Sequence, residues 1–341
     1  MVSASLAHRT TPALPARAKA TLSSKRHCIT LTFNSMLSVI VNFYNNRREA
    51  KNTLHSLTRA YQKNIQDIPY EVIALDNGST LPLSEAYVRA YGPEFRYQFV
   101  ATHSQSPVTA MNNACREAAG DVVIVIIDGA HILSPGILQR THEAFRLFQA
   151  PFVATVPFHL GPKKQNRSVQ EGYNPEIEDA LLRSAGWWTD GYRLFNVTGS
   201  YADGSQGWFG CLYESGCVGM RKRDYLALGG FDERFQSRGG GLTNLDFFQR
   251  ALESKDLEYV MLLGEGTFHQ VHGGVASNAP PENHPWSEFH REYEQIRGRA
   301  FERVLRQPFL MGSLPQVRSA QRIVNDSANL GWQFWEKIVP E

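Results

Sequence analysis

The composition of the chain indicates a globular protein and argues against several other classes. Of its 341 residues, 42% are hydrophobic and 20% are charged, which is enough apolar material for one large core or two smaller ones. The formal net charge of +2 is too small to indicate a nucleic-acid partner, and the sequence has no basic motif interleaved with aromatic residues. The cysteines form no C-x-x-C pair, which argues against a zinc knuckle or a dense disulfide scaffold and favours a reducing compartment; they are Cys28, Cys115, Cys211 and Cys217.

The N-terminal residues 1–35 contain no Asp or Glu and are rich in Ser, Thr, Ala, Lys and Arg. This composition resembles a transit peptide, and a disordered tail or an over-extended start is the alternative, so the segment is left out of the predicted fold. The longest later apolar run is the six residues before Asp128, whereas a membrane-spanning helix needs roughly 20. We expect a chain without a transmembrane segment, cytoplasmic or peripheral to a membrane, with organelle targeting left open.

From Leu37 onward, short runs rich in Val and Ile alternate with segments whose apolar residues recur at helical spacing. Such successive units predict a parallel sheet with right-handed crossovers and helices on both faces. The second helical segment ends at Gly120, a residue typical of helix C-termini. We predict strands at residues 37–46, 70–75 and 121–127, and helices at residues 48–62 and 108–120.

Three polar residues, Asn42, Asp76 and Asp128, stand where predicted strands end. The carboxyl ends of parallel strands line a common crevice, so these side chains are expected to gather there. An acid in this position is costly to desolvate unless it is paired, hydrogen-bonded or bound to a metal. Taken alone, a strand-terminal Asp can equally well cap the helix or turn that follows.

Four blocks of the sequence resemble, in order, the signature blocks of family 2 glycosyltransferases and their relatives of the GT-A fold. They are LSVIVNFYNN, YEVIALDNGST, NNACREAAGDVVIVIIDGAHILSPGIL and ESGCVGMRKRDYLALGGFDERF. The resemblance extends across roughly residues 36–275, and a set of blocks in order is more specific than any single motif. It implies an α/β fold of the Rossmann-like GT-A class, with a mostly parallel sheet flanked by helices.

The resemblance also implies a nucleotide-sugar donor, with a UDP-sugar as the leading expectation. By position, Asp76 would contact the nucleotide base, and Asp128 would hold the donor diphosphate through Mn²⁺ or Mg²⁺. Such a cation, held by hard oxygen ligands, stabilises the negative charge that builds on the departing diphosphate. The expected donor-binding residues are Asn42, Tyr44, Asp76, Asn112 and Asp128.

The metal motif departs from the usual Asp-x-Asp, because Ala130 stands where the second carboxylate is expected. His131 is a candidate replacement, and the polypeptide N-acetylgalactosaminyltransferases use a similar Asp-x-His motif with a spacing one residue shorter. GT-A enzymes commonly take a last metal ligand from a downstream histidine, which here points to His269 or His272. We therefore expect a mixed oxygen and nitrogen site; metal-free or lost activity is the alternative.

The acceptor block is also altered. Inverting members of the family use a carboxylate as general base, usually the first acid of a block like Glu-Asp-x-Asp. Thr243 and Asn244 occupy the positions of the first acids, which leaves Asp246 as the candidate catalytic base. A helix N-cap at Asn244 or Asp246 is the alternative, and Asp203 and Glu214 are further candidate bases.

The remaining segments carry weaker signals. An aromatic cluster between residues 186 and 209 predicts either a sugar-stacking surface or ordinary burial under a loop; it contains Trp187, Trp188, Tyr192, Tyr201 and Trp208. Beyond the glycosyltransferase domain at residues 36–275, two amphipathic patterns predict a small helical extension at residues 276–341. These helices are candidates for covering the active site, for dimerisation or for contact with a membrane surface.

These observations favour an inverting, metal-assisted glycosyltransferase of the hexosyltransferase type that acts on a glycan or a lipid-linked saccharide, as in polysaccharide biosynthesis. The rival function is a GT-A-like domain that binds a sugar nucleotide or glycan without transfer, because both the metal motif and the base positions are altered. A nucleotidyltransferase is disfavoured, since no glycine-rich phosphate loop with Arg or Lys follows the first predicted strand.

Overall fold

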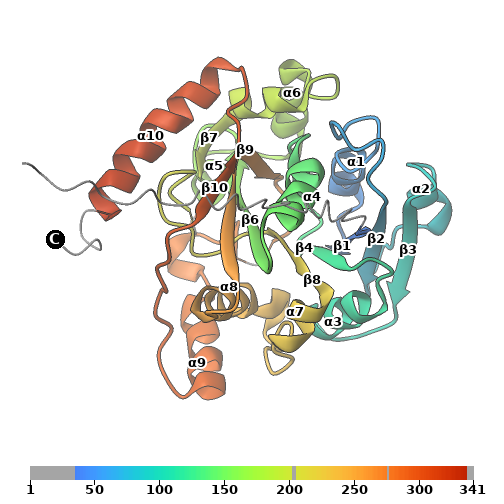
Figure 1. Ribbon diagram of the computed structural model, residues 1–341, viewed down its shortest axis with the longest axis vertical. Coiled ribbons are helices and arrows are strands. Elements are labelled where there is room, and N and C mark those ends of the chain that lie inside the picture. The colour runs from blue at the N-terminus through green and yellow to red at the C-terminus, as the bar shows by residue number, and fades with distance from the viewer. Residues whose placement is uncertain (1–34, 202–204, 275, 336–341) are drawn as a thin grey trace, which may run out of the picture. The chain divides into compact units, whose positions relative to one another are not determined.

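The apolar runs of the sequence form the strands of one sheet in a computed structural model that describes residues 35–201, 205–274 and 276–335 (Figure 1). The N-terminal targeting or tail prediction and Asp203 lie outside these residues. The strands within the described residues are β1 (Leu37–Phe43), β2 (Tyr70–Asn77), β3 (Phe95–Val100), β4 (Val122–Ile126), β5 (His131–Leu133), β6 (Pro151–Leu160), β7 (Thr198–Tyr201), β8 (Cys217–Arg221), β9 (Glu258–His269) and β10 (Phe309–Gly312).

The helices fill the intervals between the strands, as the alternating sequence pattern predicts. The α-helices of the described residues are α1 (Arg47–His55), α2 (Glu85–Arg89), α3 (Val108–Glu117), α4 (Ile137–Leu147), α5 (Gln165–Gln170), α6 (Pro175–Ala185), α7 (Lys222–Ala227), α8 (Thr243–Glu253), α9 (Trp286–Arg297) and α10 (Arg318–Trp335). Short 3₁₀ segments are η1 (Gly191–Val197), η2 (Arg238–Gly240) and η3 (Pro281–Asn283).

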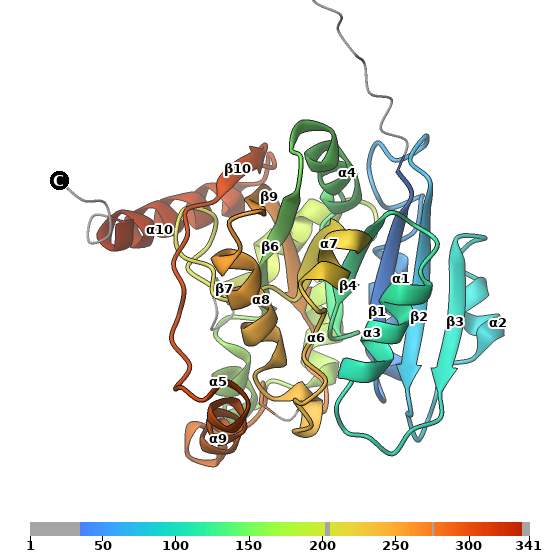
Figure 2. The ribbon, with the colours of Figure 1, turned by 60° about the horizontal axis from the view of Figure 1, so that its bottom comes forward.

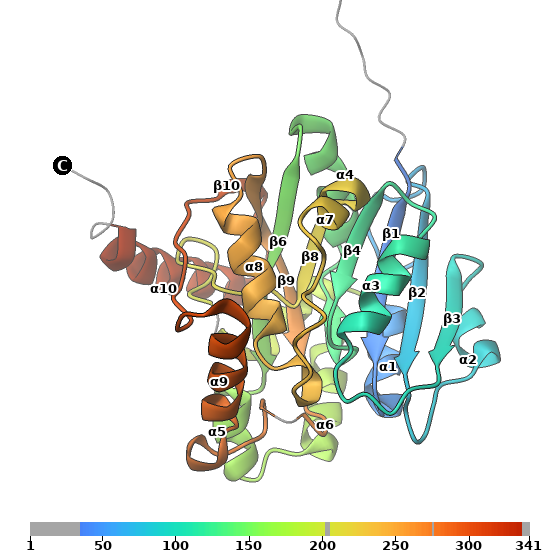
Figure 3. The same cartoon turned by 90° about the horizontal axis from the view of Figure 1, so that it is seen from below.

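The strand order in the sheet is β10-β9-β6-β8-β4-β1-β2-β3, and β5 and β7 pair with β9 and β6 (Figure 3). Along this order β8 runs antiparallel to both of its neighbours, whereas the other neighbours are parallel. Because β8 is antiparallel to β4, its first residue, Cys217, lies beside Ile126, the last residue of β4. The segment that leads into β8 therefore reaches the carboxyl edge of the parallel strands.

Two hydrophobic cores cover the two faces of the sheet. Alternate residues of β1 point to opposite faces, so Ile40 packs in the core beneath α3, α7 and α8, while Val39 and Val41 pack beneath α1, α2 and α4. Figure 3 shows the first group of helices in front of the strands. Strands covered on both sides need continuous apolar sequence, which explains why every residue of β1 and β4 is buried.

The helix predicted at residues 48–62 is shorter in the structure, because α1 ends at His55. The residues that follow still contribute their predicted apolar face: Leu57 is fully buried, and the hydroxyl of Tyr61 donates to the carbonyl of Leu133 at 2.7 Å. Gln62 donates to the carbonyls of Ser56 and Ser134 at 2.8 and 3.0 Å. Contacts with the β5 region thus replace the last helical turn.

The C-terminal region contains the two predicted helices, α9 and α10, and also a strand that the sequence pattern did not predict. This strand, β10, pairs in parallel with β9 at the end of the sheet (Figure 2). Trp208 and Phe268 belong to the same core cluster as Phe289 and Tyr293 of α9 and Ile323 of α10. No helix among the described residues is both long enough and apolar enough to cross a membrane.

Candidate active site and family

Asp128 lies two residues beyond the end of β4, at the carboxyl edge of the sheet. Its Oδ1 accepts a hydrogen bond from the backbone N–H of Ala130 at 2.9 Å, which closes the turn into β5. The turn needs Gly129, because a Cβ there would lie 2.3 Å from the ring of Phe43. The Asp128 side chain is 28% exposed, and its second oxygen, Oδ2, faces a group of histidines.

Three histidines lie close to Asp128. Strand β5 pairs with the end of β9 and places His131 opposite His269. Asp128 Oδ2 lies 3.2 Å from His269 Nε2 and 3.0 Å from His272 Nε2, and the two Nε2 atoms are 3.2 Å apart. The ligand atoms of Asp128, His131 and His269 all lie within 4.8 Å of one another. The structure therefore brings together the four residues that the sequence analysis named as metal ligands.

The electrostatics of this cluster keep its members in distinct charge states. Burial by itself would raise the pKa of Asp128, but His272 and His269 outweigh burial and hold that pKa well below its ordinary value. Burial, reinforced by His269, lowers the pKa of His131 to about 3. Near pH 7 Asp128 is thus an anion and His131 is neutral, with a lone pair on one ring nitrogen. Both are states in which these groups bind metals.

The segment that carries His272 is fixed by two residues that the sequence analysis missed. The backbone N–H of Val271 donates to Glu178 Oε2 at 2.9 Å, and the carbonyl of Val271 accepts from Arg48 Nη1 at 2.9 Å. Arg48 also contacts Glu178 at 3.0 Å and Asp179 at 2.8 Å. No local pattern could have revealed this clamp, since Arg48 and Val271 are 223 positions apart.

Asp76 turns away from solvent. Its Oδ1 accepts from the backbone N–H of Ser79, and its Oδ2 from that of Leu83, each at 3.0 Å. The hydroxyl of Tyr97 also lies 3.3 Å from Oδ2, and Asp76 is fully buried. These hydrogen bonds show that Asp76 stabilises the loop after β2. The contact of Asp76 with a nucleotide base stays a prediction.

The other expected donor-binding residues divide into two groups. Tyr44 follows β1 and is 47% exposed, so its ring is available at the carboxyl edge. Asn42 donates to the carbonyl of Ile127 at 3.1 Å, while its buried Oδ1 has no hydrogen-bond partner. Asn112, in contrast, is 2% exposed and accepts from Tyr225 Oη (2.7 Å) and the Phe231 N–H (3.0 Å). Its contacts join α3 to the loop after α7, so the structure does not bring it to the crevice.

Asp246 is enclosed by arginines. Its carboxylate is 1% exposed and contacts Arg250 at 2.8 Å within α8 and Arg297 at 2.6 and 2.7 Å from the end of α9. The residue before α8 is Leu242, which makes no side-chain cap. Asp246 therefore ties α9 to α8. The alternative hypothesis, a helix N-cap at Asn244 or Asp246, is wrong, because the N-cap position is Leu242. Its role as base stays a prediction that these ion pairs disfavour.

A different carboxylate lies next to the start of α8. Asn244 Nδ2 donates to Glu214 Oε2 at 3.3 Å, and both side chains are half-buried. Glu214 precedes β8, whose first residue is at the carboxyl edge beside β4. Two residues after Glu214, Gly216 lies against His131, because a Cβ at Gly216 would be 3.0 Å from His131 Nε2. This arrangement places Glu214 in a segment that contacts the histidine cluster.

Burial explains part of the aromatic cluster. Trp187 and Trp208 are fully buried, and Trp208 Nε1 donates to the carbonyl of Glu265 at 2.8 Å. Trp188 is 43% exposed and stacks on His55 with ring centroids 3.8 Å apart. The side chain of Tyr201 lies outside the described residues. Core packing therefore accounts for Trp187 and Trp208, whereas Trp188 retains an accessible ring.

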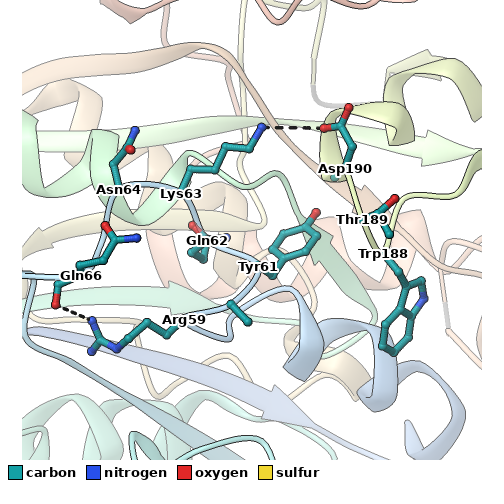
Figure 4. Close-up of a pocket in the computed structure, with 11 residues that line it drawn as sticks. Arg59, Tyr61, Gln62, Lys63, Asn64, Gln66, Trp188, Thr189 and Asp190 are labelled. Atoms are coloured by element: carbon teal, nitrogen blue, oxygen red, sulfur yellow. Dashed lines mark hydrogen bonds and ion pairs between the residues drawn. The ribbon is translucent and has the colours of Figure 1, made fainter.

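Trp188 lies at a pocket of about 310 Å³ that is separate from Asp128 (Figure 4). Residues 59–64 and 66 form one wall and residues 188–191 the other, and Lys63 approaches Asp190 across the pocket at 3.8 Å. Arg59 packs over Tyr70, the first residue of β2, whereas the crevice lies at the other end of that strand, about 20 Å away. The pocket therefore belongs to the amino edge of the sheet.

A family model described as "Glycosyl transferase family 2" matches residues 38–210, just over half of the chain. The match agrees with the sequence blocks, the sheet topology and the Asp128 turn. The chain belongs to glycosyl transferase family 2. The α/β fold of the GT-A class, with helices on both faces of the sheet, is confirmed, and the matched residues include most of β1, all of β4, Asp128 and His131.

Solved structures of similar architecture have low sequence identity to this family 2 glycosyltransferase. S. aureus TarS 1-349 in complex with UDP is 13% identical, with a TM-score of 0.44, over 86% of this chain and 70% of that chain. The mannosyltransferase PcManGT from Pyrobaculum calidifontis, in complex with GDP-Man and Mn²⁺, is 16% identical, with a TM-score of 0.44, over 88% and 70%. A comparison with curated proteins gave no match. These similarities are too low to identify a donor for this chain.

Proposed function

We propose that this family 2 chain transfers a hexose from a nucleotide-sugar donor, a UDP-sugar, to a glycan or a lipid-linked saccharide. The observation that carries the proposal is the convergence of Asp128 with His269 and His272 at the carboxyl edge of the sheet, within 3.2 Å of one another. Ligands of open α/β sheets bind at this edge. An accessible aromatic ring, Tyr44, lies at the end of β1 and suits stacking on a nucleotide base.

The donor atoms fit a divalent cation. Two ligands at right angles, each about 2.1 Å from such an ion, lie about 3 Å apart, and Asp128 Oδ2 is 3.2 Å from His269 Nε2. The buried Nδ1 of His131 has no hydrogen-bond partner. Asp128, His131 and His269 are the proposed ligands, and their imidazoles favour Mn²⁺ over Mg²⁺, which prefers oxygen. When bound, the cation would neutralise charge on the departing diphosphate.

We assign deprotonation of the acceptor to Glu214 rather than to Asp246. In an inverting transfer the acceptor oxygen attacks the anomeric carbon as its proton passes to a carboxylate, and the bond to the diphosphate breaks with its electron pair on oxygen. Asp246 could take that proton only by giving up contacts with two arginines. Glu214 is half-buried beside Asn244, the position where the family usually has an acid. The Asn244 amide suits the task of orienting it.

A second candidate function is binding of a sugar nucleotide without transfer. The enclosed carboxylate of Asp246 and the absence of a second acid in the Asp128 turn favour it. Under this alternative the crevice would still bind the donor, so nucleotide binding alone does not decide between the two functions. Only the transfer reaction does.

Calorimetry with UDP, GDP, ADP and CDP, each with Mn²⁺, Mg²⁺ or EDTA, tests the proposed site. Tight binding of one nucleotide only with metal is expected, and it should disappear in Asp128→Ala. Asp121→Ala is the matched control, because Asp121 is exposed at the opposite end of β4. Equal binding in EDTA would contradict the metal-assisted site. The two candidate functions are separated by a second measurement on wild type. Hydrolysis of the sugar nucleotide that corresponds to the bound nucleotide would support an enzyme, and no hydrolysis would support a protein that binds the donor without transfer.

A further inference from the structure

His269 and His272 contact the same oxygen, yet their other ring nitrogens have opposite kinds of partner. The Nδ1 atom of His269 lies 2.6 Å from Gln165 Oε1, an acceptor. The Nδ1 atom of His272 lies 3.3 Å from Asn46 Nδ2, a donor. A neutral imidazole carries one proton, so the partner of Nδ1 determines whether Nε2 has a lone pair or an N–H.

The orientation of Gln165 follows from a backbone group. Asn278 donates through Nδ2 to the carbonyl of His272, which can only accept, so Asn278 presents its Oδ1 on the other side. Gln165 Nε2 donates to that oxygen at 2.6 Å, and Gln165 Oε1 therefore faces His269. Because an amide oxygen can only accept, the proton of neutral His269 is on Nδ1. Its Nε2, 3.2 Å from Asp128 Oδ2, carries a lone pair.

The orientation of Asn46 also follows from a backbone group. The N–H of Tyr44, which can only donate, gives a hydrogen bond to Asn46 Oδ1 at 2.9 Å. Asn46 Nδ2 is therefore the atom next to His272 Nδ1, and Nδ1 accepts from it. The proton of neutral His272 is consequently on Nε2, which lies 3.0 Å from Asp128 Oδ2 and 3.2 Å from His269 Nε2.

We propose that the two histidines have different functions: His269 is a cation ligand, and His272 is a hydrogen-bond donor to the diphosphate of the donor. The role of His272 towards the diphosphate rests on the proposed function, whereas the tautomers of the two histidines do not. An Nε2 lone pair binds a metal, whereas an N–H cannot. In the structure the His272 N–H faces Asp128 Oδ2 at 3.0 Å. With that oxygen bound to a cation, the same N–H would be available to stabilise the diphosphate oxygen as its bond to the sugar breaks. The proton stays on His272 in this step.

The tautomers are tested directly by two-dimensional ¹⁵N–¹H NMR of the histidine rings in the full-length, metal-free protein near pH 8. His269 is expected to be protonated on Nδ1 and His272 on Nε2, with assignments from His269→Gln and His272→Gln. Asn46→Asp keeps the acceptor for Tyr44 but places a carboxylate oxygen next to His272 Nδ1, so it should move the proton to Nδ1. Asn45→Asp adds the same charge one position away, where Asn45 Oδ1 accepts from Thr80 and Leu81, and should leave both tautomers unchanged.

Calorimetry with Mn²⁺ alone and with UDP plus Mn²⁺ tests the functional difference. His269→Gln should weaken Mn²⁺ binding by about 100-fold. His272→Phe should leave Mn²⁺ binding within about threefold and weaken UDP by about tenfold, while His272→Gln, which keeps an N–H, should recover most of that loss. Identical tautomers, or equal loss of Mn²⁺ in the His269 and His272 variants, would overturn the inference. If wild type binds Mn²⁺ but no nucleoside diphosphate, the proposed function and the donor role of His272 both fail, whereas the NMR result still decides the tautomers.

Discussion

Asp128 and Asp246 are both carboxylates held by nitrogen-bearing side chains, but their surroundings differ in two respects. Asp128 contacts His269 and His272 and is 28% exposed, whereas Asp246 contacts Arg250 and Arg297 and is 1% exposed. Histidines bind a cation when they lose a proton, while arginines stay charged at every accessible pH. The partners of an acid, more than the acid itself, therefore indicate whether it is available for chemistry.

Glu214 is the third acid near the crevice. It is half-buried and receives a hydrogen bond from an uncharged amide, that of Asn244. This amide orients Glu214 Oε2 towards the start of α8, beside the position where the family usually has an acid. The comparison therefore predicts separate consequences for the three acids: loss of donor binding at Asp128, loss of turnover at Glu214, and loss of stability at Asp246.

Removal of Asp128 should have the largest effect. Asp128→Ala takes away the anionic ligand at the centre of the cluster, so metal-dependent nucleotide binding should fall more than about 100-fold and turnover should disappear. Thermal unfolding should change little, because the side chain is partly exposed. Calorimetry and a melting curve measure the two effects. A variant that keeps metal-dependent binding would remove Asp128 from the site.

Glu214→Gln should lower turnover by about 100-fold or more, the usual effect of losing a general base. Nucleotide binding should stay near that of wild type, because Glu214 is assigned to the acceptor side. The measurement is hydrolysis or transfer of whichever sugar nucleotide wild type uses, beside calorimetry with the nucleotide. Full turnover in this variant would show that the base lies elsewhere.

Asp246→Asn should act mainly on stability. It removes the carboxylate partner of Arg250 and leaves Arg297 paired with Asp232 at 3.0 Å. Because each arginine is about a fifth exposed, we expect a loss of about 2 kcal/mol, less than for a fully buried pair. Denaturant unfolding measures this, with the exposed Asp326→Asn as control. Unchanged stability together with lost turnover would reverse the assignment and make Asp246 the base.

Acidification should reveal the smallest effect. Hydrogen bonds from Arg234, aided by Arg297, lower the pKa of Asp232 to about 2 against an opposing contribution from burial. A depressed native pKa stabilises the fold above about pH 4, and this contribution is lost as the pH falls towards 2. Its size should be under about 1 kcal/mol, since Arg234 is largely exposed. Unfolding measured from pH 5 to 2 should be less pH-dependent in Asp232→Asn, and an equally steep decline would contradict this account.

Much of the fold could be predicted because its signals are local. The strands at β1, β2 and β4 match the predicted ones to within a few residues, since a run of Val and Ile covered on both faces is distinctive in sequence. The ends of elements were less predictable: α1 stops at His55 because Tyr61 and Gln62 find partners near β5. Strand β10 was missed, since its four residues are recognisable only by their pairing with β9.

By itself the sequence determined the family, the α/β architecture and the position of Asp128 at the end of a central strand, because these follow from residues adjacent in the chain. The tertiary structure alone decided which acids are enclosed. Asp246 meets Arg297 from 51 positions away, and His272 is held by Asn46 from 226 positions away. The chemistry of an acid or an imidazole depends on atoms within about 3 Å, and the fold, not the local sequence, places those atoms there.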